Sequence, residues 1–89
     1  MIPAISGDTF EAALEEANHA VAKHGEHQTP LCQHMDRRDK LVILVEELGE
    51  VAHALTYDAG DLIAPVDNLR VELFQLAAMA LMWAQSEER

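Results

Sequence analysis

The stretch "LVILVEELGEVAHAL", residues 41–55, holds Glu46, Glu47 and Glu50 in an otherwise mostly apolar segment. Carboxylates are costly to remove from water unless something pairs with them. Residues three or four positions apart are neighbours on a helix surface, so Glu47 and Glu50 project together. Glu46 points further round, toward the side of His53. The segment therefore predicts a helix that carries a pair of acids beside its apolar face.

This helix is expected to run from about Arg37 to about Tyr57, with Asp36 as its N-cap and Gly60 as its stop. At about 100° per residue, five aliphatic side chains form one stripe, which is the expected core face. The stripe consists of Leu41, Leu44, Leu48, Val51 and Leu55. Glu47 and Glu50 lie beside it.

A second polar pair follows in "VELFQLAAMALMWA", residues 71–84, which is apolar nearly all round. Glu72 and Gln75 are three positions apart on one face, and Met79 and Trp83 continue that face. The helix is expected to begin near Pro65 and to end at about Ser86, largely buried. If the two helices pack antiparallel, their polar pairs converge, which is how helix bundles build metal sites.

The rest of the chain predicts one further helix, from about Thr9 to about His24, capped by Asp8 and ended by Gly25. Residues 25–35 are expected to form a loop. The fold class is therefore all-α, with three helices per chain in a single domain over residues 1–89, after a short N-terminal tail over 1–7. We expect a four-helix-type bundle that is completed by self-association.

Composition supports this interpretation and excludes several functions. The chain has 89 residues, 49% of them hydrophobic, and a formal net charge of −10. So short a chain buries a small share of its surface, so part of this apolar surface is expected to lie between subunits of a homodimer or homotetramer. Phosphate contacts need Lys and Arg, so nucleic-acid binding is not expected. The chain has a single cysteine and neither a signal peptide nor a membrane span is apparent, which predicts a cytoplasmic protein.

Oxygen ligands from the two pairs suit a hard cation. Glu47, Glu50, Glu72 and Gln75 are the candidate metal ligands, with Mg²⁺ as the expected ion and Mn²⁺ as an alternative. Glutamates on helices are also common as solvated surface residues, and this simpler interpretation stays open for Glu47 and Glu50. Glu72 is harder to place in solvent, because its helix is apolar on most sides.

The motifs "EELGEV" and "ELFQLAAMALMWAQS" on successive helices resemble the MazG-like family of all-α nucleoside triphosphate pyrophosphohydrolases, over roughly residues 9–86. The resemblance implies Mg²⁺ at Glu47, Glu50, Glu72 and Gln75. It also implies attack of a metal-activated water on a nucleoside triphosphate, giving a monophosphate and pyrophosphate. Gln75 stands where the family usually has Asp, which lowers the charge of the site.

Candidate catalytic and substrate residues follow from this chemistry. Glu46 or Glu47 could accept the proton of the attacking water. Lys23, beside His24 at the end of the first helix, and Arg70 could bind phosphate, and Trp83 could stack on a base. Two alternatives remain. The first is an inactive homologue that binds nucleotide or metal as a regulator, and Gln75 favours it. The second is a plain helical oligomerisation module.

Overall fold

The computed structural model describes residues 4–56 and 68–88, and these ranges form three α-helices, one short 3₁₀ helix and no strand. The elements in chain order are α1 (Gly7–His24), η1 (Glu26–Gln28), α2 (Arg37–Thr56) and α3 (Leu69–Glu87). The predicted all-α class and its three helices are confirmed. No helix among these residues is long and apolar enough to cross a membrane.

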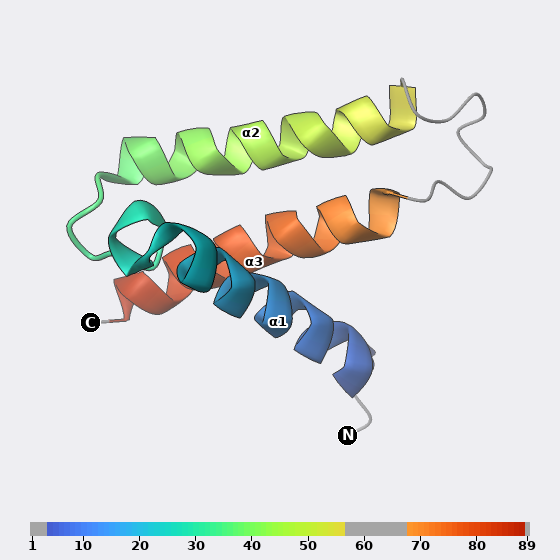
Figure 1. Ribbon diagram of the computed structural model, residues 1–89, viewed down its shortest axis with the longest axis horizontal. Helices are drawn as coiled ribbons and strands as arrows, with labels where there is room; N and C mark the ends of the chain where they lie inside the picture. Colours follow the sequence, from blue (N-terminus) through green and yellow to red (C-terminus); the bar gives the residue numbers. More distant parts are fainter. Residues whose placement is uncertain (1–3, 57–67, 89) are drawn as a thin grey trace.

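The central element is α3. It runs antiparallel beside α2, while α1 crosses in front of it at an angle (Figure 1). Within the described ranges α1 packs on α3 and η1, and its backbone does not come close to that of α2. The principal extents of the chain are 42 × 35 × 21 Å.

Local side chains explain where the helices begin and end. Ser6 caps α1, because its Oγ accepts a hydrogen bond from the N–H of Thr9 at 3.1 Å. The prediction of Asp8 as the cap was wrong, since Asp8 already lies in the first turn. Gly25 ends α1 as predicted, with a φ of 82° that favours glycine.

At the start of α2, Asp36 acts as predicted: its Oδ1 accepts from the N–H of Arg38 at 2.7 Å. The predicted end of this helix at Tyr57, its stop at Gly60 and the predicted start of the next helix at Pro65 lie outside the described residues.

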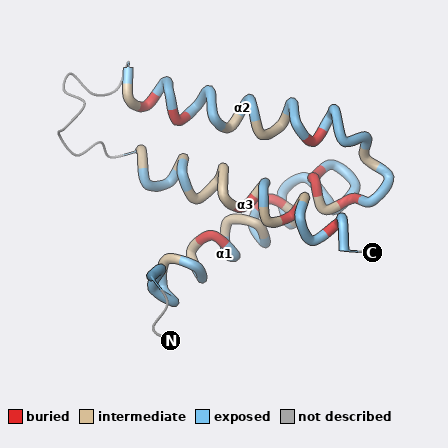
Figure 2. Tube along the Cα trace, turned by 180° about the vertical axis from the view of Figure 1, so that it is seen from behind, coloured by how far each residue is buried: buried red, intermediate tan, exposed pale blue. Residues whose placement is uncertain are grey.

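Buried positions are few and lie scattered along the helices (Figure 2), and most of the buried apolar residues have small side chains. Buried apolar residues of the described ranges are Ala13, Ala20, Cys32, Val51, Ala54, Ala78 and Met82. The predicted core face of α2 is right for Val51, which is buried, and wrong for Leu41 and Leu48, which are 54% and 55% exposed. The other buried residues of α2 are Lys40 and Ala54, so the buried side of the helix is rotated away from these two leucines.

Polar side chains join α2 to the end of α3. The buried Lys40 donates from Nζ to the Oγ of Ser86 at 2.7 Å, and that Oγ donates to the carbonyl of Trp83 at 2.6 Å. Nearby, Arg37 forms a two-bond ion pair with Glu87, at 2.9 Å and 2.8 Å. These links fix the register of the two antiparallel helices at the end opposite the acidic residues.

Candidate functional site

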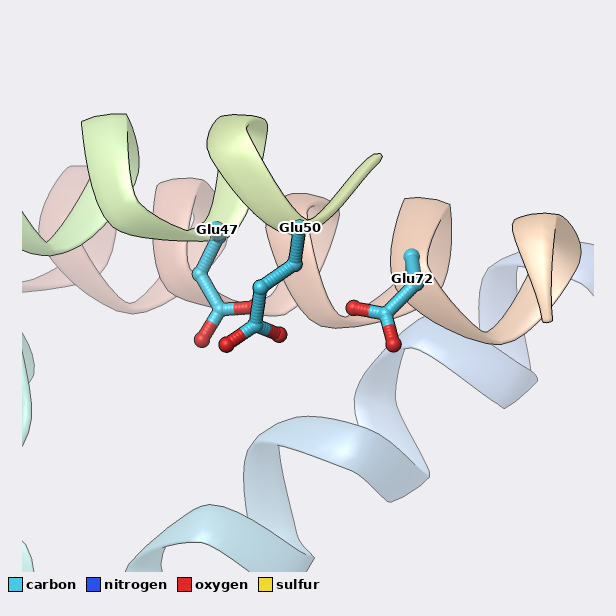
Figure 3. A group of neighbouring side chains, drawn as sticks. All are labelled: Glu47, Glu50 and Glu72. Atoms are coloured by element: carbon cyan, nitrogen blue, oxygen red, sulfur yellow. The ribbon is translucent and has the colours of Figure 1, made fainter. Parts of the chain in front are cut away.

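Three carboxylates from two helices meet where the C-terminal half of α2 lies beside the N-terminal half of α3. Glu47 and Glu50 project from α2, and Glu72 projects from α3 toward them (Figure 3). One oxygen from each can be chosen so that all three lie within 4.8 Å of one another. These three residues are called the acidic cluster below. The structure thus brings together three of the four predicted metal ligands.

The positions of these acids follow from local helix geometry. Glu47 and Glu50 are one turn apart, so they share a face of α2. Glu72 lies in the first turn of α3, where the free backbone N–H groups and the helix dipole favour a negative charge. Because α2 and α3 are antiparallel, the end of one helix meets the start of the other.

The carboxylates of the cluster interact unfavourably when no cation is bound. Burial of its carboxyl group, followed by repulsion from Glu50 and Glu72, raises the pKa of Glu47 above its ordinary value. The Oε2 of Glu47 is buried and has no hydrogen-bond partner. Buried polar atoms are normally paired, so this oxygen has the property expected of a ligand atom that awaits a cation.

A cavity of about 270 Å³ opens beside the cluster, between α1 and α2. Its lining comes from all three helices and consists of Glu16, His19, Ala20, Lys23, His24, Glu47, Glu50, Gln75 and Met79. The wall formed by α2 is acidic, and the wall formed by α1 carries one acid, Glu16, beside Lys23 and two histidines. Among the described residues, Lys23 is the only Lys or Arg side chain in this lining, so it is the group best suited to meet an anionic part of a ligand.

Sequence reasoning missed Glu16 and His19 as members of this cavity. They precede Lys23 at helical spacing, three and four positions apart, so they form one polar stripe of α1 with it. That stripe was the available signal. Glu16 also contributes to the raised pKa of Glu47, which places its charge close to the cluster.

The predicted site residues divide into two groups. Lys23, His24 and Gln75 line the cavity together with Glu47 and Glu50 of the cluster. The other three predicted residues, Arg70, Trp83 and Glu46, do not line the cavity. Arg70 places its guanidinium 4.8 Å from the centre of the Phe74 ring, on another face of α3.

Trp83 is likewise drawn away from the cavity, because its indole N–H donates to Glu87 at 3.1 Å at the far end of α3. Glu46 is exposed and is not part of the cavity lining. The physical reason is the same for all three residues: each is rotated about its helix axis, or displaced along it, away from the face that carries the acids.

Comparisons of the chain with models of protein families, with curated proteins and with solved structures find no match.

Proposed function

We propose that this protein is a Mg²⁺-dependent nucleotide pyrophosphohydrolase of the MazG-like type, which hydrolyses a nucleoside triphosphate to the monophosphate and pyrophosphate. The observation that carries the proposal is the two-sided cavity. Its acidic wall suits a divalent cation, and Lys23 and His24 on the facing wall suit the phosphates that the cation would accompany.

The residues fit Mg²⁺ in their donor chemistry. Glu47, Glu50 and Glu72 offer carboxylate oxygens and Gln75 offers an amide oxygen, and hard cations prefer such ligands. The unpaired Oε2 of Glu47 is the most specific indication. When bound, the ion would neutralise the triphosphate and polarise its phosphoryl oxygens.

The chain's own residues would then bind and orient the triphosphate and accept a proton. Lys23 and His24 would hold the phosphate oxygens against the acidic wall. Of the two candidate bases, Glu47 lines the cavity and Glu46 does not, so we assign proton acceptance to Glu47.

Gln75 favours a second candidate function, which is nucleotide or metal binding without hydrolysis. It occupies the cavity wall with a neutral side chain, so the formal charge of the ligand set is that of three carboxylates. A lower charge holds a single divalent ion less tightly and opposes the clustering of several ions.

The decisive experiment is a screen for pyrophosphate release over common and modified nucleoside triphosphates with Mg²⁺ present. We expect turnover by the parent, none by Glu50→Gln, and unchanged turnover by Glu15→Gln, an exposed acid of α1 outside the cavity. Equal turnover by the parent and by Glu50→Gln would reject the site.

Calorimetric titration separates the remaining alternatives. Binding of Mg²⁺ and a non-hydrolysable triphosphate without pyrophosphate release would support the non-catalytic homologue. No heat of binding for either ligand would support a plain helical oligomerisation module.

A further inference from the structure

The face of α3 that points away from the acidic cluster carries apolar and mostly small side chains. Leu73, Ala77, Ala80 and Ala84 recur at spacings of four, three and four positions, so they form one stripe, called the alanine face below. On one side this face forms the floor of a groove of about 670 Å³ shared with Ile5 and Phe10. On the other side Ala80 and Ala84 continue into a hollow beside Leu44 of α2.

Large side chains around the alanine face are left uncovered by the chain itself. Ile5 is 62% exposed, Phe10 52% and Leu73 47%. The α2 stripe next to Leu44 adds two residues of similar exposure, which are Leu41 and Leu48. With these side chains about half exposed, the apolar area on this side is on the order of 500 Å² before the alanines are counted.

Such an area is a large part of the roughly 800 Å² that each partner buries in a stable interface. Helices normally bury their apolar faces against a neighbouring element, and among the described residues α3 packs only on α1 and α2, which leave the alanine face uncovered. The face therefore has the size and composition of half of an interface.

Charge also selects the partner. The chain has 16 acidic residues, yet among the described residues lining the two hollows only Glu87 is acidic, and Arg37 already neutralises it. The remaining charged residue of the lining is Arg70. A second copy of so acidic a chain can approach this face without meeting an uncompensated carboxylate.

We propose that this face binds a second copy of the chain, with the two α3 helices packed antiparallel about a two-fold axis near Ala78 and Met79. In this register Leu73 of one copy lies against Ala84 of the other, and Ala77 against Ala80, so that large meets small and the helix axes approach closely. Arg70 lies against Glu87 at both ends. The surface is self-complementary, which is the requirement for a two-fold dimer.

The opposite orientation is disfavoured by the same residues. Parallel packing places Leu73 against Leu73 and Arg70 against Arg70. The alanine face also lies about 150° round α3 from Glu72, Gln75 and Met79. The dimer therefore leaves both acidic cavities open, and the inference does not depend on the proposed activity.

Sedimentation equilibrium of the full chain tests whether the alanine face forms a dimer interface. We expect the parent to be a dimer of the 9.9 kDa chain and Leu73→Glu to weaken dimerisation at least about 100-fold, because it buries an unpaired carboxylate. Val71→Glu is the matched control, since Val71 is 44% exposed on the same helix but points away from the face. A monomeric parent at every concentration, or equal loss of the dimer in both variants, would overturn the proposal.

Cross-linking tests the register and does not require a charged substitution. In a Cys32→Ser background, copies with Leu73→Cys should form disulfides with copies carrying Ala84→Cys, and neither should pair with itself. The two copies of Leu73 lie about 16 Å apart in the antiparallel register, because eleven residues of helix separate Leu73 from Ala84. Self-pairing of Leu73→Cys without the mixed product would overturn the register.

Discussion

Substituting Glu50 by Gln tests the acidic cluster without any need for activity. The change removes one of three carboxylates whose ligand oxygens lie within 4.8 Å of one another, and it keeps the size of the side chain. We expect Glu50→Gln to be more stable than the parent without Mg²⁺ and less stable than the parent with Mg²⁺. An ordinary surface glutamate has no reason to behave in this way.

The magnitude follows from the geometry. Two unit charges 4.8 Å apart repel by about 1 kcal/mol in water and by about 3.5 kcal/mol at an effective dielectric constant of 20. Because Glu50 is exposed, the lower figure applies. Metal-free Glu50→Gln should therefore be more stable than the parent by about 1 kcal/mol, or about 4–8 °C in Tm for a domain of this size.

Magnesium should reverse this order. At a concentration 100 times its Kd, a ligand stabilises the folded state by about 2.7 kcal/mol, and Glu50→Gln removes one of the charged ligands. The assay is thermal unfolding followed by circular dichroism at one protein concentration, with EDTA or with excess Mg²⁺. Glu15→Gln is the control and should follow the parent. A lower Tm of Glu50→Gln in EDTA, or an equal Mg²⁺ shift in both proteins, would refute the reasoning.

Three further predictions concern the packing of α2 on α3 and the ligands of the site. Ser86→Ala should cost about 1.5–3 kcal/mol in urea unfolding because it leaves the Lys40 ammonium without its buried partner, whereas adding Lys40→Met should recover most of the loss. Hydrogen bonds from Arg37 and then Trp83 lower the pKa of Glu87 from 4.5 to about 2, so the stabilising effect of Glu87 is present above pH 4.5 and lost toward pH 2. The stability difference between the parent and Glu87→Gln should therefore vanish over that range. Gln75→Asp adds a charged ligand and should tighten Mg²⁺ binding about tenfold in calorimetry.

Local signals predicted the helices well because each boundary depends on a few neighbouring residues. Gly25 ends α1 and Asp36 caps α2 through contacts that lie within a few positions of them. The leucine stripe of α2 was misassigned for a different reason. Periodicity shows that a helix face is apolar, but it does not say whether the chain itself or another copy covers that face, and here Leu41 and Leu48 stay exposed within one chain.

The acidic cluster could be found from the sequence because glutamates in apolar helices are costly to bury and therefore conspicuous. The α1 wall was harder to find, since Glu16 and His19 lie on a polar face that resembles an ordinary solvated surface. Arg70 and Trp83 were assigned to the site by residue type alone. Their placement depends on partners, the Phe74 ring and the Glu87 carboxylate, that residue type does not reveal.

The two faces of α3 lead to a last prediction, which concerns their independence. Glu72 belongs to the acidic cluster, and Leu73 lies in the outward groove. Effects at distant sites without shared partners add, so binding of Mg²⁺ and self-association should stabilise the chain separately. In thermal melts, Leu73→Glu should lose the dependence of Tm on protein concentration and keep the Mg²⁺ shift, and Glu50→Gln should show the reverse. If either substitution removes both effects, the cavity and the interface are coupled, and assigning them to separate faces is wrong.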